Sequence, residues 1–147
     1  MTEEVMSRES RMLAGILLVV LPTVMYGGLT LLSFLTRNAP GYADNPLRHD
    51  LGRAGHAHAG VYLVRSLVML RYVDEAVLSP FGKWLARTGA PIAAILIPVA
   101  FFLSVLSPAA KEPNGSMNLT YIGALFLAAA VLSLGVGLIR AARQMGP

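Results

Sequence analysis

The chain has 147 residues, of which 55% are hydrophobic and 14% charged, and its formal net charge is +4. Soluble domains usually carry roughly 25% charged residues, so this composition excludes an ordinary soluble globular protein and indicates a membrane protein. The absence of cysteine excludes disulfides, thiolate metal ligands and cysteine nucleophiles. Because the basic residues lie at the ends of apolar segments, we expect membrane lipids and not nucleic acid as their partners.

Four long apolar segments predict an all-α fold, an integral membrane four-helix bundle that forms one transmembrane domain over residues 1–147. Each segment approaches or exceeds the ~20 residues that a helix needs to cross a bilayer core. The expected spans are residues 12–35, 54–73, 84–106 and 119–139. The first is longer than the apolar part of a signal peptide, about 7 to 15 residues, so we expect it to be a retained span.

The longest expected connection, residues 36–53, joins the first two spans. It contains Pro40-Gly41 and Asn45-Pro46, and these pairs favour turns over a fifth helix. We therefore expect one structured loop on this side of the bundle.

The second span opens with residues 53–60, RAGHAHAG, which hold two of the three histidines of the chain. At ~100° per residue, His58, Tyr62 and Arg65 share one stripe of the helix, whereas His56 lies about 200° away from His58. The two histidines therefore cannot face one centre in a regular helix. A zinc or copper site needs three or four converging ligands, whereas one histidine is enough for an axial ligand of haem. A histidine that only bonds a neighbouring carbonyl is the alternative.

Arg65 lies midway along the second span. All eight acidic residues lie in the termini or loops, so no span offers it a counter-ion. Its charge has to be met by backbone carbonyls, by snorkelling to the interface, by an anionic lipid or by a carboxylate such as a haem propionate. Because snorkelling from the middle of a helix is difficult, we favour a buried partner or ligand.

The third and fourth spans contain residues that affect helix shape and packing. Pro91 and Pro98 remove backbone donors from the third span, so we expect that helix to bend. Gly123, Gly135 and Gly137 in the fourth span allow close approach of another helix. That neighbour is either in the same subunit or in another copy of the chain.

The distribution of Lys and Arg predicts the orientation. Seven lie on the side that holds both termini and the connection between the second and third spans, and four lie on the opposite side. The positive-inside rule then predicts a multi-pass protein of the cell (inner) membrane with cytoplasmic termini. The histidines are expected near the outer face.

Ala57-His58-Ala59-Gly60 resembles the Ala-His-small-Gly motif of the styrene oxide isomerases, a family of small four-helix membrane enzymes. Further landmarks of that family follow in the same order over essentially the whole chain. They are Arg11-Met12 with Gly15, Gly41-Tyr42, Arg53-Ala54, Phe101-Phe102-Leu103, Ser107-Pro108 and Asn114-Gly115.

The resemblance implies a homotrimer with haem b held at subunit interfaces and His58 as the axial ligand of the iron. His56 is the alternative ligand, because the family pattern can also be matched with a one-residue gap. Arg53 and Arg65 are further candidate haem contacts. In that family the ferric iron acts as a Lewis acid on an aryl epoxide, which rearranges by a hydride shift to an aryl acetaldehyde.

Two positions depart from the family. An asparagine six residues after the ligating histidine is replaced by Val64, and a tyrosine near the end of the third helix is replaced by Phe102 or Leu103. One donor aimed at a developing oxyanion can be worth ~3 kcal/mol, so we expect weakened or redirected chemistry. Tyr62 and Arg65 are the candidate catalytic residues that could substitute.

The resemblance therefore implies a haem b-dependent isomerase that converts a small apolar or aryl epoxide to a carbonyl compound. The missing donors favour an alternative, a non-catalytic haem- or metal-binding membrane subunit. A second alternative is a structural membrane protein in which Arg65 holds an anionic lipid.

Overall fold

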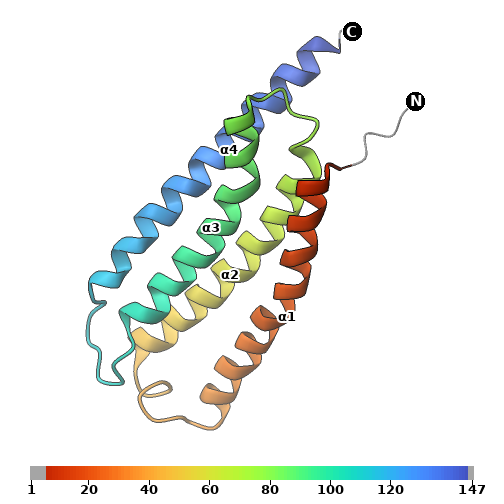
Figure 1. The fold of residues 1–147 in the computed structure, drawn as a ribbon. Coiled ribbons are helices and arrows are strands. Elements are labelled where there is room, and N and C mark those ends of the chain that lie inside the picture. Colours follow the sequence, from red (N-terminus) through yellow and green to blue (C-terminus); the bar gives the residue numbers. More distant parts are fainter. Residues whose placement is uncertain (1–5, 146–147) are drawn as a thin grey trace.

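The computed structural model describes residues 6–145, which form four long helices and no strand. Consecutive helices run up and down beside one another in a bundle (Figure 1). They are α1 (Arg8–Thr36), α2 (Pro46–Tyr72), α3 (Pro80–Ser104) and α4 (Leu119–Gln144), with a short 3-10 helix, η1 (Gly115–Asn118), directly before α4. The all-α four-helix fold predicted from the sequence is confirmed.

The first three helices each begin at a polar cap. The side chains of Ser7, Asn45 and Ser79 each accept a hydrogen bond from the backbone N–H three residues later. Such caps satisfy a donor that has no partner inside the helix. Pro46 and Pro80 occupy the first positions of α2 and α3, where a missing N–H leaves nothing unpaired.

α2 starts well before the expected span. The helix begins at residue 46, so the expectation of turns throughout residues 36–53 is wrong, and the loop comprises residues 37–45. We expected the Asn45-Pro46 pair to mark a turn, but this pair caps and opens a helix instead. The added turns of α2 carry Arg48, His49 and Asp50 at the same end of the bundle as the loop.

α2, α3 and α4 pack around one core, and α1 contributes no residue to its buried cluster. The cluster consists of Met69, Val73, Ala76, Ala86, Ala90, Ala130 and Leu134. Small residues bring α3 and α4 close together: a Cβ on Gly89 would lie 2.7 Å from the Cβ of Ala130, and one on Gly123 would lie 2.6 Å from Ile97. Gly123 therefore serves packing within the subunit, whereas Gly135 faces open space.

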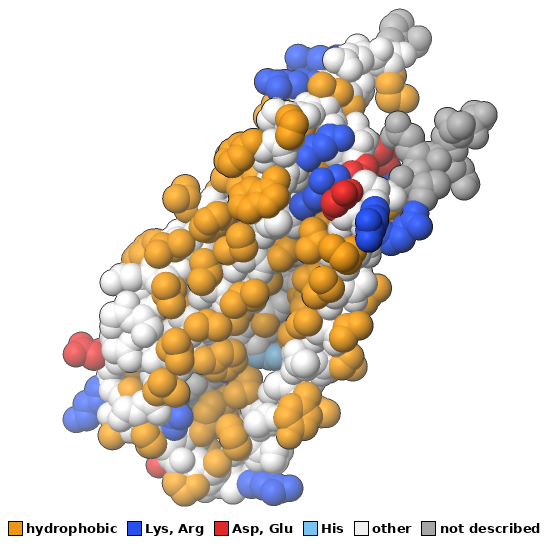
Figure 2. Space-filling model, viewed as in Figure 1, with side chains coloured by type: hydrophobic (Ala, Val, Ile, Leu, Met, Phe, Trp, Pro, Cys, Tyr) orange, Lys and Arg blue, Asp and Glu red, His pale blue; other side chains and the backbone are white. Residues whose placement is uncertain are grey.

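α1 is attached to the bundle mainly through α2. None of its most apolar 18-residue stretch is buried, and side chains such as Val19, Met25 and Tyr26 are largely exposed. Figure 2 shows hydrophobic side chains over the middle of the molecule and charged side chains gathered at its two ends. This distribution suits a bilayer, in which an apolar surface needs no protein cover.

Among the helices of the described residues, three are long and apolar enough to cross a membrane. They are α1, α3 and the η1–α4 segment, Gly115–Gln144. α2 does not reach the same hydropathy, because its first half carries several charged residues and histidines. The expected span 54–73 is therefore the less polar part of a helix that lies between α1 and α3.

The start of α1, the α2–α3 connection and the end of α4 lie at one end of the bundle (Figure 1). At this end Arg87 donates to Asp74 at 2.6 Å and to Ser10 at 3.0 Å, and the backbone N–H of Ser7 donates to Asp74 at 3.0 Å. Only 17% of each of the two charged side chains is exposed. The cluster ties the start of α1 to α2 and α3.

Burial alone would raise the pKa of Asp74. The hydrogen bonds from Ser10, Ser7 and Arg87 outweigh that effect and hold the pKa below its usual value. Asp74 is therefore ionised in the folded chain and contributes to the attachment of α1 over the whole neutral range.

Candidate functional site

The N-terminal end of α2 is held in place by hydrogen bonds to two connections. Nε of Arg48 donates to the carbonyl oxygen of Val105 at 2.8 Å, and its Nη1 donates to the carbonyl oxygen of Gly41. The side-chain amide of Asn45 donates to the carbonyl oxygen of Ala110 at 2.9 Å. These contacts join the α1–α2 loop, the start of α2 and the end of α3. They fix the first turn of α2, which leads into the histidine segment.

Two of the landmarks quoted for the family resemblance contact each other here. Gly41 has φ +70°, and a Cβ at this position would lie 2.7 Å from the Cβ of Pro108. Both the backbone conformation and the close approach require glycine. Asn114, another landmark, donates from its side chain to the carbonyl oxygen of Leu103 at 2.9 Å. The landmarks thus shape the loops at this end of the bundle.

His58 lies on α2 with its ring half-buried against α3. Its Nδ1 is 2.7 Å from the carbonyl oxygen of Ala54, and its ring centroid is 5.2 Å from that of Phe101 and 5.3 Å from that of Tyr62. A carbonyl only accepts, so Nδ1 carries the proton of a neutral ring and Nε2 keeps its lone pair. Within residues 6–145, Nε2 has no hydrogen-bond partner.

Tyr62 and Arg65 continue the same face of α2, as the helical period predicts. The guanidinium carbon of Arg65 lies 5.6 Å from the centroid of the Tyr62 ring. Arg65 is exposed, and it has no ion-pair or hydrogen-bond partner in the part of the chain that the structure describes. The buried partner that we favoured from the sequence is therefore not supplied by residues 6–145 of the same chain.

The positions that depart from the family are apolar and partly open. Val64 is 51% exposed on α2, and Phe102 and Leu103 at the end of α3 are 39% and 37% exposed. The ring of Phe102 packs over Gly55, where an added Cβ would lie 3.1 Å away. None of the three side chains offers a hydrogen-bond donor.

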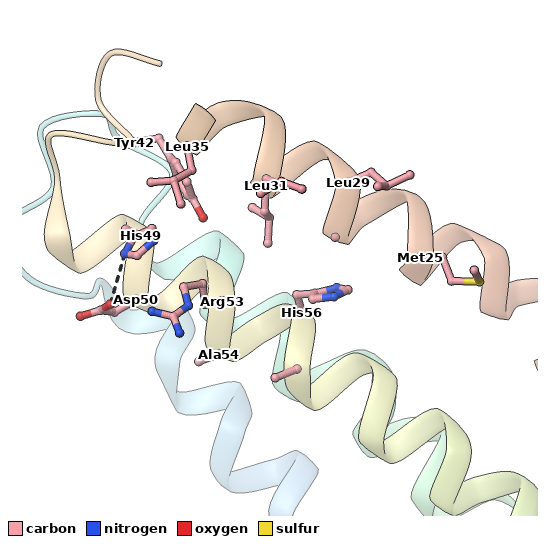
Figure 3. Close-up of a pocket in the computed structure, with 13 residues that line it drawn as sticks. Met25, Leu29, Leu31, Leu35, Tyr42, His49, Asp50, Arg53, Ala54 and His56 are labelled. Carbon is pink, nitrogen blue, oxygen red and sulfur yellow. Dashed lines mark ion pairs between the residues drawn. The ribbon is translucent and has the colours of Figure 1, made fainter. Parts of the chain in front are cut away.

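His56 points to the other side of α2, into a groove of about 1000 Å³ between α1 and α2 (Figure 3). A Cβ on Gly28 of α1 would lie 2.7 Å from Nε2 of His56, so the glycine makes room for the imidazole. The separation of His56 and His58 onto two faces, expected from the helical period, is confirmed.

Arg53 lines the groove of His56 and does not join the His58 face. At the same end of the groove, Nδ1 of His49 lies 3.4 Å from Asp50. Tyr42 is 7% exposed, and burial raises the pKa of its hydroxyl although the charges of Arg53 and Arg48 act in the opposite direction. The candidate cofactor contacts predicted from the sequence thus divide between two sites.

Gly28, His49 and Tyr42 were not predicted from the sequence as parts of this groove. The Gly27-Gly28 pair in an otherwise bulky apolar span was the available signal, but the sequence does not show which histidine faces it. Within residues 6–145, no group of three or more His, Asp or Glu side chains comes together in a way that could hold a metal ion.

Comparison with family models, with curated proteins and with solved structures gave no match to this chain. The resemblance to the styrene oxide isomerases therefore rests on the quoted residues and stays a prediction.

Proposed function

We propose that this chain is a haem b-dependent membrane isomerase that converts a small apolar or aryl epoxide to the carbonyl compound. The observation that carries the proposal is the hydrogen bond between Nδ1 of His58 and the carbonyl oxygen of Ala54, which leaves Nε2 available. A histidine that binds a metal usually donates its other ring N–H to a carbonyl or carboxylate, which fixes the tautomer and orients the ring. The contact between His58 and Ala54 has this form.

The surroundings of His58 fit a haem. Its face of α2 is flanked by the Phe101 ring and by Tyr62. Arg65 lies two helical turns further along and supplies a positive charge without a partner in residues 6–145, as a propionate requires. Ferric haem supplies a Lewis acid at such a site. Its ligand in the proposal is His58, and Arg65 is its charged contact.

The residues of this chain would hold the substrate and exclude water. The Tyr62 hydroxyl and the Arg65 guanidinium are donors on the His58 face that can bind an epoxide oxygen. Phe101 provides an apolar surface for the rest of the substrate. Exclusion of water matters, because water that reached the opening epoxide would give a diol in place of a carbonyl compound.

The proposal includes a homotrimer in the inner membrane with cytoplasmic termini. The exposed face of α2 carries Arg65, seven residues before the end of the helix, and an arginine on a lipid-facing helix costs up to roughly 2.5–3.5 kcal/mol at the bilayer centre and less toward the interface. A neighbouring subunit and a bound propionate over this face would remove that cost. The exposed arginine thus supports an assembly of any number of subunits.

The test is an absorption spectrum of the detergent-purified protein, oxidised and reduced, after expression with haem supply. We expect a Soret band in the wild-type protein. His58→Ala should abolish it, whereas His56→Ala should keep it, because His56 lies on the opposite face of α2. A colourless wild-type protein, or a His58→Ala protein with an unchanged spectrum, would contradict the proposal.

Val64, together with Phe102 or Leu103, favours a second candidate, a haem-binding membrane subunit without isomerase activity. These positions lack the donors that the resemblance associates with turnover. Incubation of the holoprotein with an aryl epoxide separates the candidates. Formation of the aryl acetaldehyde supports the isomerase, and a stable haem complex that leaves the epoxide unchanged supports the second candidate.

A further inference from the structure

The groove between α1 and α2 is distinct from the face that carries His58. Its α1 wall runs from Leu35 to Met25, about 15 Å along the helix, and it consists mainly of leucine side chains. Its α2 wall contributes Ala54 and Ala57. Figure 2 shows a hollow beside α1, where a histidine side chain is visible between hydrophobic ones. Because α1 is otherwise uncovered, the groove opens sideways toward the bilayer.

His56 is the polar group deep in this groove. Within the described residues, its imidazole has no hydrogen-bond partner, although it is half-buried next to Gly28. A polar group that leaves water without a new partner costs roughly 1–3 kcal/mol. Space is kept for the ring, since any side chain at position 28 would displace it. Between the leucines of α1 and the alanines of α2, the groove therefore offers the imidazole of His56 as a donor, apart from the polar residues at its end.

The charges of the groove lie at its outer end and offset each other. Arg53 is positive, Asp50 is negative, and His49 lies 3.4 Å from Asp50. An anionic ligand would meet Asp50 as well as Arg53, and it would bring its charge beside the apolar α1 wall. These features favour a ligand without a net charge.

We propose that this groove binds an uncharged apolar molecule with one hydrogen-bond-accepting oxygen, such as an ether, epoxide or ketone, which enters from the bilayer. The imidazole N–H of His56 donates to that oxygen, and the α1 leucines contact the hydrocarbon part. The site goes beyond the proposed function, because it does not require haem at His58. Its ligand class overlaps with that of the proposed substrate, so the groove would also concentrate such a substrate near the bundle.

The experiment uses the full chain in phosphatidylcholine nanodiscs. The probes are an aliphatic ketone with a terminal diazirine and the matched hydrocarbon without the carbonyl, and mass spectrometry maps the cross-links. In the wild-type protein we expect the ketone to label residues 25–35 and 53–57 more strongly than the hydrocarbon does. His56→Phe should lower ketone labelling about fivefold, the usual effect of one lost hydrogen bond, and leave hydrocarbon labelling unchanged.

Two neighbouring glycines provide a matched pair of variants. Gly28→Leu fills the groove and should abolish labelling by both probes, whereas Gly27→Leu points into open space and should change nothing. His58→Ala should retain ketone labelling, which separates a failure of this proposal from a failure of the haem proposal. Full labelling in His58→Ala together with loss in Gly28→Leu supports the site.

Several results would overturn the proposal. Equal labelling by the ketone and the hydrocarbon in the wild-type protein would show that His56 recognises no oxygen. A phospholipid probe that the ketone cannot displace would identify a lipid site. Loss of the Soret band in Gly28→Leu would assign the groove to haem, and a changed oligomer mass in native mass spectrometry would identify a subunit interface.

Discussion

Val64 lies one residue before Arg65 on the exposed face of α2, where the resemblance places an asparagine. Val64→Asn restores a donor and acceptor at this position. If the His58 face performs epoxide isomerisation, we expect the turnover of an aryl epoxide to increase at least tenfold, because one well-placed donor can be worth ~3 kcal/mol in the transition state. The aldehyde product, measured by gas chromatography, provides the rate.

Val68→Asn is the matched control for this substitution. Val68 lies one turn further along the same face, and 53% of its surface is exposed, close to the value for Val64. We expect no increase in turnover for this variant. An equal increase in both variants would mean that a general change of the α2 surface, and not a donor beside the substrate, alters the rate.

Asp74 contributes to the attachment of α1 through its contacts with Ser7 and Arg87. Asp74→Asn keeps the size of the side chain but removes the charge that Arg87 contacts at 2.6 Å. We expect a loss of roughly 1–3 kcal/mol of stability at pH 7, because hydrogen bonds between charged groups contribute on this scale. The measurement is thermal unfolding in detergent. Glu75→Gln is the control, because its ion pair with Arg71 is exposed and contributes little.

The difference in stability between the wild-type protein and Asp74→Asn should depend on pH in a defined way. The pKa of Asp74 is lower in the folded chain than in the unfolded one, so its contribution is complete above the ordinary carboxyl pKa and is lost as the pH falls through the folded value. The difference in melting temperature between wild type and Asp74→Asn should therefore be constant from pH 8 to about pH 5 and should shrink at more acidic pH. A difference that grows on acidification would contradict this assignment.

At the scale of helices, the contact between α3 and α4 depends on Gly89. A Cβ there would lie 2.8 Å from the backbone oxygen of Phe126, which cannot move without its helix. Gly89→Ala should therefore lower the melting temperature, although alanine is the better helix former. In Gly135→Ala nothing opposes the gain in helix propensity, about 1 kcal/mol, so the melting temperature should stay the same or rise.

A lower melting temperature for Gly89→Ala and an unchanged or higher one for Gly135→Ala would support the packing of α3 against α4. If Gly89→Ala proved neutral, α3 and α4 would have to lie further apart than the structure shows. If Gly135→Ala destabilised the protein instead, Gly135 would face a neighbouring subunit, and the second explanation for the small residues of α4 would apply to it.

The presence of four helices could be predicted from the sequence, because the length of each apolar segment and its helical period can be read from neighbouring residues alone. The division between His56 and His58 follows from ~100° per residue and needs no tertiary information. The predicted start of α2 was wrong, because the pair Asn45-Pro46 fits both a turn and a capped helix start. Only the tertiary contacts of Arg48 and Asn45 decide between the two. The groove could not be predicted, because it depends on how far α1 lies from α2.

For the whole molecule, the absence of cysteine allows a direct test of orientation. Two exposed serine or glutamine positions lie at opposite ends of the bundle: Ser107 follows α3, and Gln144 ends α4. We introduce Ser107→Cys or Gln144→Cys and label spheroplasts with a membrane-impermeant maleimide. Under the positive-inside rule, Ser107→Cys should react in intact spheroplasts and Gln144→Cys only after permeabilisation.

The outcome also bears on the access of ligands to both sites. With cytoplasmic termini, the charged outer end of the groove at Arg53 faces the periplasmic side, and His56 and His58 lie in the outer half of the bilayer. The reverse labelling pattern would place both histidines in the cytoplasmic half and would show that the seven basic residues at the other end do not set the topology. Labelling of both variants in intact spheroplasts would indicate mixed insertion, and α2, with its many polar residues, would then not be held in a single orientation.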